Sequence, residues 1–125
     1  TLNTDFMDIL ISCCDGTLNQ LTINFSKSKS ICIVLCSKGY PEKFENNIEI
    51  KDLEQLKPLE NQKIFHAGTL KTKTGIVSNG GRVLNFVSLS EDLGSAREEI
   101  INNIDKLNWD GGFYRKDIGY KVIDR

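Results

Sequence analysis

No apolar run in this 125-residue sequence approaches the roughly 20 residues that a membrane-spanning helix needs, so we expect no membrane partner. Basic residues are not in excess, because 16 Lys and Arg stand against 17 Asp and Glu and the formal net charge is −1. Without a strong positive charge, we expect no nucleic-acid partner either. Asp5 and Asp8 interrupt the apolar residues near the N-terminus, so no signal peptide is predicted. The first residue is Thr1 rather than Met, and we expect the natural N-terminus to lie upstream.

Patterns typical of metal sites and disulfides are missing as well. The sequence has four cysteines, none in a Cys-x-x-Cys pair, and its one histidine is His66. Zinc ligands normally come as closely spaced pairs, so the pattern argues against a metal site. Disulfide frameworks are typical of small secreted domains with little core, whereas 39% of this sequence is hydrophobic. We therefore predict a cytoplasmic protein with reduced, buried cysteines, namely Cys13, Cys14, Cys32 and Cys36.

The first part of the sequence predicts a helix followed by strands. Over "TDFMDILISCCDG", residues 4–16, apolar side chains recur at helical spacing, and Thr4 is a candidate N-cap. Residues 21–25 alternate between apolar and polar, which predicts part of a strand. "ICIVLC", residues 31–36, is a continuous apolar run rich in β-branched residues, and it predicts a central strand buried on both faces.

The second part predicts more strands and then the clearest helix. "KIFHAGT", residues 63–69, indicates a short strand and a glycine turn, and residues 71–90 indicate a hairpin whose turn is the Asn-Gly pair. Residues 91–108 predict a long helix with Ser90 as candidate N-cap. Its apolar stripe consists of Leu93, Ala96, Ile100, Ile104 and Leu107. This order predicts an α+β fold, a mainly antiparallel sheet with a long helix packed on one face.

The stretch "SNGGRVLNFVSL", residues 78–89, is the best candidate for a binding site. One interpretation is an ordinary hairpin with a solvated Arg82, which the pattern alone favours because Asn-Gly turns are common in hairpins. The other is an anion site, in which the N–H groups of Gly80 and Gly81 and the guanidinium of Arg82 hold a phosphate. Both interpretations remain open at this point.

The remaining polar residues predict no complete active site. A lone histidine such as His66 is more often structural, or a substrate contact, than a general base. No nucleophile motif, phosphate-binding loop of the Walker type or acidic pair stands out, so we predict no catalytic residue and no metal ligand in this chain. Arg115 and Lys116 lie beside tyrosines, and RNA binding there is a weaker option than pairing with Asp117.

Four stretches, in order, resemble one family. They are "VLCSKGYP", "KIFHAGT", "SNGGRVLNFVSL" and "WDGGFYRKDIGYK". Together they resemble the C-terminal domain of the phosphoribosylamine–glycine ligases, which are ATP-grasp enzymes. The resemblance covers nearly the whole chain. It implies that residues 1–20 are the final helix of the ATP-grasp core and that residues 21–125 are the ligase C-terminal domain.

The resemblance also implies a function. These ligases join glycine to 5-phosphoribosylamine in purine biosynthesis, using ATP and Mg²⁺ or Mn²⁺ that bind mainly to regions absent here. The chain is then expected to be inactive alone, to need the rest of the ligase chain as partner, and to close the substrate side of the site. The implied substrate-binding residues are Gly80, Gly81 and Arg82, followed by His66, Gly68 and Thr69. A non-catalytic binding module that retains the fold is the alternative.

One position departs from the family pattern. The family usually shows a lysine directly after "FHAGT", whereas here Leu70 precedes Lys71. We therefore do not assign a ligand contact to Lys71.

Overall fold

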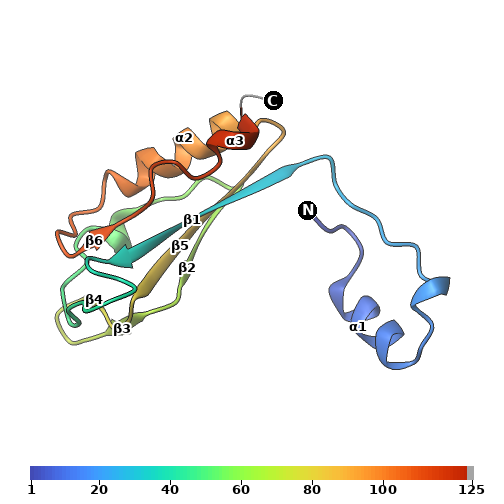
Figure 1. Ribbon diagram of the computed structural model, residues 1–125, viewed down its shortest axis with the longest axis horizontal. Coiled ribbons are helices and arrows are strands. Elements are labelled where there is room, and N and C mark those ends of the chain that lie inside the picture. The colour runs from blue at the N-terminus through green and yellow to red at the C-terminus, as the bar shows by residue number, and fades with distance from the viewer. Residues whose placement is uncertain (124–125) are drawn as a thin grey trace.

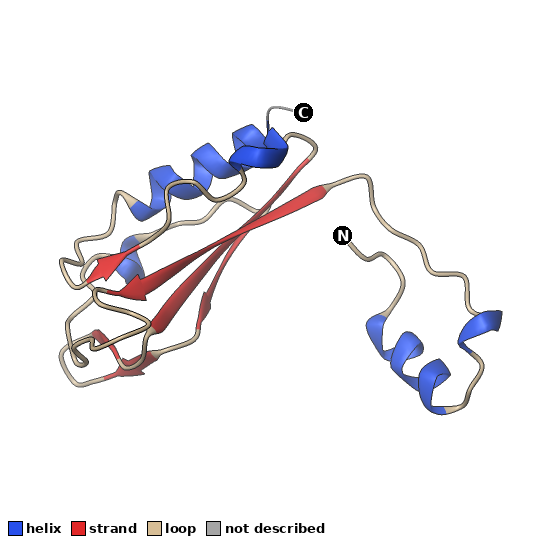
Figure 2. Ribbon diagram, viewed as in Figure 1, coloured by secondary structure: helices blue, strands red, loops and turns tan. Residues whose placement is uncertain are grey.

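The computed structural model describes residues 1–123 and shows an antiparallel sheet with helices on one face (Figures 1 and 2). The main sheet has four strands in the order β2-β5-β1-β6, and β3-β4 form a separate two-stranded sheet. The strands are β1 (Lys29–Ser37), β2 (Gln62–His66), β3 (Thr69–Lys71), β4 (Ile76–Ser78), β5 (Arg82–Ser90) and β6 (Gly112–Phe113). The helices are α1 (Phe6–Cys14), α2 (Leu93–Ile104) and α3 (Tyr120–Ile123), with 3₁₀ turns η1 (Leu18–Gln20) and η2 (Leu53–Gln55). The predicted α+β class with a mainly antiparallel sheet is confirmed.

Helix α2 lies across β1 and β5, and the core fills the space between them. The predicted stripe faces this core, with Ala96, Ile100 and Ile104 buried. At 12 residues α2 is of average rather than great length. The predicted N-cap is wrong: Ser90 stays in β5, and the cap is Asp92, whose carboxylate accepts a 2.7 Å hydrogen bond from the Ser95 N–H.

Strand β1 is central in the sheet but is buried on one face only. Its side chains alternate, with Ile31, Ile33 and Leu35 in the core and Cys32 exposed on the other side. The prediction of burial on both faces is therefore wrong, because in the described residues no element covers the second face. We call this second surface the uncovered face. Its side chains include the mostly apolar set Cys32, Val34, Cys36, Phe65, Val87 and Leu89, together with the polar Ser30, Lys63 and Asn85.

The predicted burial of the cysteines is also wrong. All four thiols are free, and none is buried: three are exposed, and Cys36 is half-buried. Partial desolvation by neighbouring groups raises the pKa of the Cys32 thiol, and it raises the pKa of the Cys36 thiol against the opposing effect of the Arg82 charge.

Residues 1–28 form an N-terminal arm that stands apart from the sheet and α2 (Figure 1). Its helix α1 has no buried residue. The strand predicted over residues 21–25 does not form: within residues 1–123 this segment makes one isolated bridge, from Phe25 to Leu2, instead of a ladder. The α1 cap is Asp5 rather than Thr4, whose hydroxyl instead accepts a 2.7 Å hydrogen bond from the Asn24 N–H. Within residues 1–123, the helices are too short or too polar to cross a membrane.

The hairpin predicted over residues 71–90 is also wrong. Strand β4 pairs with β3, whereas β5 pairs with β1 and β2, so the Asn79–Gly81 segment joins two sheets instead of closing a hairpin. This change of partner matters for the candidate site, because the segment meets Ser37 at the end of β1 and two loop residues, Tyr40 and Gly68.

Candidate functional site

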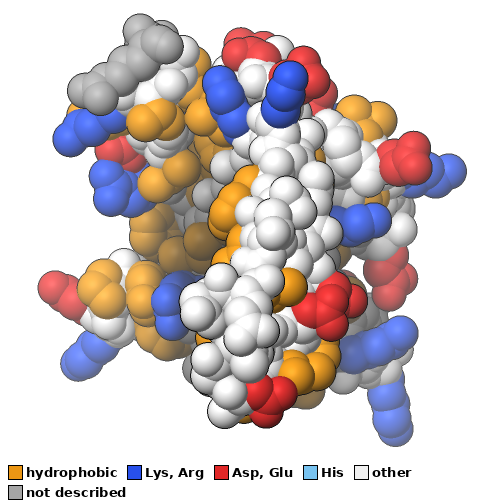
Figure 3. Space-filling model, turned by 90° about the vertical axis from the view of Figure 1, so that its right-hand side faces the viewer, with side chains coloured by type: hydrophobic (Ala, Val, Ile, Leu, Met, Phe, Trp, Pro, Cys, Tyr) orange, Lys and Arg blue, Asp and Glu red, His pale blue; other side chains and the backbone are white. Residues whose placement is uncertain are grey.

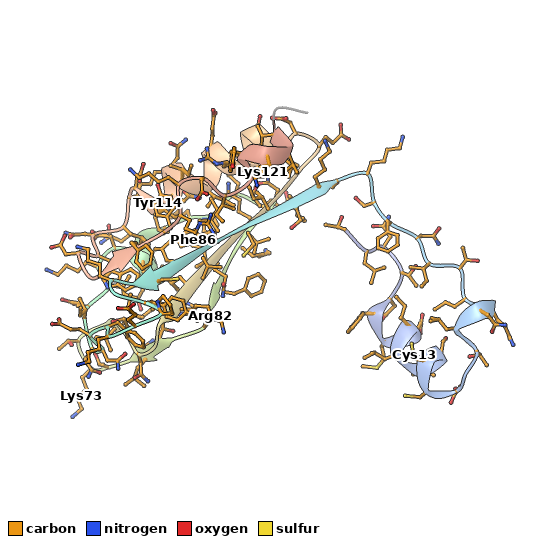
Figure 4. All side chains as sticks on the ribbon, viewed as in Figure 1. Cys13, Lys73, Arg82, Phe86, Tyr114 and Lys121 are labelled. Atoms are coloured by element: carbon orange, nitrogen blue, oxygen red, sulfur yellow. The ribbon has the colours of Figure 1, made fainter. Side chains whose placement is uncertain are left out.

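A β-bulge directs Arg82 onto the uncovered face. Leu35 pairs with Leu84, but the next residue of β1, Cys36, pairs with Arg82, so Val83 is the extra residue. Val83 and Leu84 are both fully buried. Strict alternation along β5 would point Arg82 into the core, on the side of Leu84, and the bulge reverses this direction. Arg82 therefore lies on the same face as Asn85, and both line one pocket. Figure 4 labels Arg82 on the ribbon.

The turn before Arg82 is held by its carbonyl groups. The Ser37 N–H donates a 2.8 Å hydrogen bond to the Gly81 carbonyl, and the Ser37 hydroxyl donates one of 2.8 Å to the Gly80 carbonyl. Within residues 1–123, the N–H groups of Gly80 and Gly81 donate no hydrogen bond. A turn with fixed carbonyls and two free N–H groups offers donors to an anion.

A second glycine turn packs against the first. The Val83 carbonyl accepts hydrogen bonds from the Ala67 N–H at 3.0 Å and the Gly68 N–H at 3.2 Å. A Cβ added at Gly68 would lie 2.6 Å from the backbone oxygen of Arg82, so only glycine allows this approach. The two predicted turns, around residues 68 and 80–82, are thus in direct backbone contact.

These turns line an open pocket of about 540 Å³ at the edge of the uncovered face. Its lining residues are Val34, Tyr40, Ala67, Gly68, Gly81, Arg82 and Asn85. Arg82 is exposed and makes no ion pair or side-chain hydrogen bond in the part of the chain that the structure describes. Its charge is therefore available to a ligand. The chemistry of the pocket suits a phosphate or another small anion.

The structure brings together some of the predicted site residues and separates others. Gly68, Gly81 and Arg82 line the pocket. Gly80 lies behind them in the turn, where its φ of +156° favours glycine. His66 is exposed and lines a different cavity, where its Nδ1 lies 2.9 Å from the Thr69 hydroxyl. That hydrogen bond spans the start of the second turn.

Sequence reasoning did not single out Tyr40 or Asn85. Tyr40 belongs to the family-like stretch "VLCSKGYP", which was the available signal. Its contact with Gly81 could not be predicted, because the two residues are far apart in the sequence. Asn85 is a polar residue within an apolar strand segment, and that pattern was the available sign of a special position.

The other candidate residues lie outside the pocket. Arg115 pairs with Asp117 at 2.6 Å on the surface. Arg97 donates hydrogen bonds to the carbonyls of Lys116 and Ile118, which ties the C-terminal segment to α2. A further cavity, of about 610 Å³, lies beside Lys38 and Asp110 and carries mixed charge. Within residues 1–123, no three Asp, Glu, His or Cys side chains gather as a metal site.

Comparisons with known proteins identify relatives. A family model described as "Phosphoribosylglycinamide synthetase, C domain" matches residues 30–121. The chain is 36% identical over 124 residues to a protein of Arabidopsis thaliana named phosphoribosylamine–glycine ligase, chloroplastic, covering 98% of this chain and 23% of that protein. It is 32% identical to a phosphoribosylamine–glycine ligase of Brucella melitensis, covering 99% of this chain and 29% of the relative.

A solved structure agrees with these relatives. The crystal structure of a phosphoribosylamine–glycine ligase from Thermotoga maritima is similar with a TM-score of 0.63 and 25% sequence identity. The match covers 86% of this chain and 27% of that chain. The chain therefore spans less than a third of the length of each of these three relatives.

Proposed function

Because the chain belongs to the family of phosphoribosylglycinamide synthetase C domains, we propose that it is the C-terminal part of a phosphoribosylamine–glycine ligase and binds the phosphate of 5-phosphoribosylamine. The resemblance found in the sequence and the family match agree on this family. The alternative, a binding module without catalysis, has no observation in its favour.

The observation that carries this proposal is the pairing of free backbone donors with a free guanidinium. The N–H groups of Gly80 and Gly81 make no hydrogen bond within residues 1–123, and Arg82 follows them directly. Glycine lets a phosphate approach the backbone closely, and an arginine offers it two parallel donors. His66 and Thr69 are proposed to stiffen the second turn, with Gly68 at the pocket wall.

In the proposed reaction, this chain positions one substrate. A phosphoryl group passes from ATP to a carboxylate oxygen of glycine, giving ADP and an acyl phosphate. The amine of 5-phosphoribosylamine then attacks the acyl carbon, the carbon–oxygen bond to phosphate breaks, and the amine loses a proton. Holding the sugar phosphate at Gly81 and Arg82 orients that amine, and orientation alone supplies a large part of such catalysis.

ATP and the divalent metal are proposed to bind upstream of this chain. Mg²⁺ and Mn²⁺ prefer carboxylate oxygens, and residues 1–123 offer no cluster of three suitable side chains. The residues of this chain therefore do not fit the metal. Without ATP, glycine and metal sites, the chain is expected to show no ligase activity alone.

The rest of the ligase is proposed to cover two apolar surfaces. The uncovered face carries hydrophobic side chains next to the pocket, and the N-terminal arm exposes Phe6, Met7 and Ile11. Viewed from the arm, hydrophobic side chains lie along it and in a recess of the body beside it (Figure 3). Exposed apolar patches of this kind usually mark an interface. We propose that residues 1–20 pack as the last helix of the preceding core.

The experiment is to replace Arg82 in the full-length ligase and to measure steady-state kinetics for each substrate. Arg82→Ala is expected to raise the KM for 5-phosphoribosylamine about 10- to 150-fold, since a charge-assisted contact contributes about 1.5–3 kcal/mol. The constants for ATP and glycine should not change. Lys73→Ala is the matched control, because Lys73 is exposed in the β3–β4 turn, away from the pocket (Figure 4).

Unchanged kinetics in Arg82→Ala would contradict the proposal. The domain would then serve as a scaffold, and the alternative of a module without a ligand role would gain support. Equal effects of Arg82→Ala and Lys73→Ala would point to general electrostatic attraction of the substrate rather than to a bound phosphate.

A further inference from the structure

The pocket extends well beyond its anion turn. Gly81 and Arg82 form one end, whereas Val34, Tyr40 and Asn85 line a part that a phosphate alone does not need. Two of these three side chains have polar groups.

Tyr40 forms a fixed wall of the pocket. It follows β1 in a turn in which the Tyr40 N–H donates a 3.1 Å hydrogen bond to the Ser37 carbonyl. Its ring rests on Gly81, where an added Cβ would lie 2.1 Å from Tyr40 Cδ2. Phe44 packs near the ring, with centroids 6.3 Å apart. Within residues 1–123 the phenol hydroxyl makes no hydrogen bond. Packing therefore fixes the position of the ring, and the hydroxyl is available to a ligand.

Asn85 is a polar side chain between two apolar neighbours on the uncovered face. It stands opposite Val34 on β1 and opposite Phe65 on β2. It is half-buried, and its amide makes no hydrogen bond in the described part of the chain. The amide is open to the pocket, where it can both donate a hydrogen bond to a ligand and accept one from it.

We infer that Tyr40 and Asn85 form a subsite for the sugar ring of a phosphorylated pentose whose phosphate lies on Gly81 and Arg82. The inference rests on the proposed function, and it adds which part of the substrate these two side chains recognise. A pentose presents hydroxyl groups that an amide and a phenol can bind, because each can donate and accept. Its carbon-bound hydrogens can pack on the Tyr40 ring. Arg82 and Asn85 lie three residues apart on one strand, on the same face, so one ligand can reach both.

The test compares two inhibitors of the full-length ligase, ribose 5-phosphate and inorganic phosphate, both competing with 5-phosphoribosylamine. Tyr40→Phe keeps the ring on Gly81 but removes the hydroxyl, and Asn85→Ala removes the amide. Each variant should weaken the binding of ribose 5-phosphate about 2- to 12-fold, the effect of losing one neutral hydrogen bond, and should leave the binding of inorganic phosphate unchanged. Val34→Ala, in the same pocket but without a polar group, is the control for changes in packing.

The outcome separates this inference from the proposed function. If both variants leave the two inhibitors unchanged, or weaken them equally, the ribose subsite is wrong. Arg82→Ala in the same assay tests the phosphate turn by itself and should weaken both inhibitors. Because inorganic phosphate has no sugar ring, a loss confined to ribose 5-phosphate supports the subsite even if Arg82→Ala has little effect.

Discussion

The ring of Tyr40 occupies the space that a side chain at position 81 would need. A Cβ built on Gly81 would lie 2.1 Å from Tyr40 Cδ2 and 2.6 Å from Cε2. These distances are far below van der Waals contact, and the ring atoms concerned cannot swing away as the end of a flexible side chain can. The turn that carries Arg82 and the turn that carries Tyr40 are therefore fixed against each other.

The first prediction is that Gly81→Ala displaces Tyr40. Forcing a methyl group into this contact should cost about 1–3 kcal/mol of unfolding free energy, by analogy with overpacked cores. Urea unfolding of the isolated chain measures the loss. In the full-length ligase the same change should raise the KM for 5-phosphoribosylamine.

A double-mutant cycle provides the control. In Tyr40→Ala the space above Gly81 is empty, so adding Gly81→Ala should then cost much less than it does in the wild type. Equal costs in both backgrounds would show that the methyl group meets something other than the Tyr40 ring.

The second prediction concerns a polar network between α2 and the sheet. Glu99 Oε2 accepts hydrogen bonds from the Ser88 hydroxyl at 3.2 Å and from the Gln62 amide at 3.1 Å. Both donors are buried. Glu99→Ala leaves them without this acceptor, and the unfolding free energy should fall by about 1–3 kcal/mol. Chemical denaturation of the isolated chain measures it.

The neighbouring Glu98 is the matched control. It is exposed and takes no part in the network, so Glu98→Ala should change stability by less than about 0.5 kcal/mol. If Glu98→Ala and Glu99→Ala destabilise equally, helix propensity or net charge explains the effect, and the network does not.

Local patterns predicted α2 and the identity of the turn residues. Ala96, Ile100 and Ile104 recur every four residues, a spacing typical of one face of a helix. The buried face of α2 could therefore be predicted from periodicity. Gly80 and Arg82 could be singled out as candidate anion ligands because their chemistry does not depend on strand pairing, and that role stays a prediction. What failed was the pairing itself. An Asn-Gly pair tolerates a positive φ in any tight turn, so it could not distinguish a hairpin from a crossing between two sheets.

The remaining misses depend on contacts between distant parts of the chain. The direction of Arg82 comes from a bulge opposite Cys36, and the wall of the pocket comes from Tyr40 on another element. Neither leaves a periodic signal. The exposure of Cys32 has a different cause. The apolar run around it is typical of a strand that is covered on both faces, but within residues 1–123 helices cover only one face of the sheet.

The third prediction concerns acid stability at the start of α2. Hydrogen bonds from the Ser95 hydroxyl and the Ser95 N–H lower the pKa of the Asp92 carboxyl. A lowered pKa in the folded state means that the stabilisation is fully present above the unfolded pKa and is lost as the pH falls through the folded pKa. Asp92→Asn keeps a capping side chain but does not titrate. Its melting temperature should therefore fall less than that of the wild type between about pH 5 and pH 2.

Glu91→Gln is the control for this pH dependence, because it removes one carboxylate next to the cap without touching it. Parallel acid profiles for wild type and Asp92→Asn would mean that the cap does not contribute to acid unfolding. A flattened profile in Glu91→Gln as well would assign the effect to overall charge.

The fourth prediction concerns the N-terminal arm. Phe6 and Ile11 are 62% and 52% exposed, and α1 buries no residue, so neither side chain stabilises the isolated chain. Phe6→Ser and Ile11→Ser should leave its melting temperature unchanged and reduce its aggregation. Leu35→Ser, in the core, is the comparison and should lower the melting temperature strongly.

In the full-length ligase the same two arm substitutions should destabilise, because the proposed core would bury both side chains. Differential scanning calorimetry of the longer protein tests this. If Phe6→Ser and Ile11→Ser are neutral there too, the arm does not pack on the preceding core, and residues 1–20 belong to a linker. A loss of stability only in the longer protein would assign the arm to the upstream core, because the same side chains contribute nothing within residues 1–123.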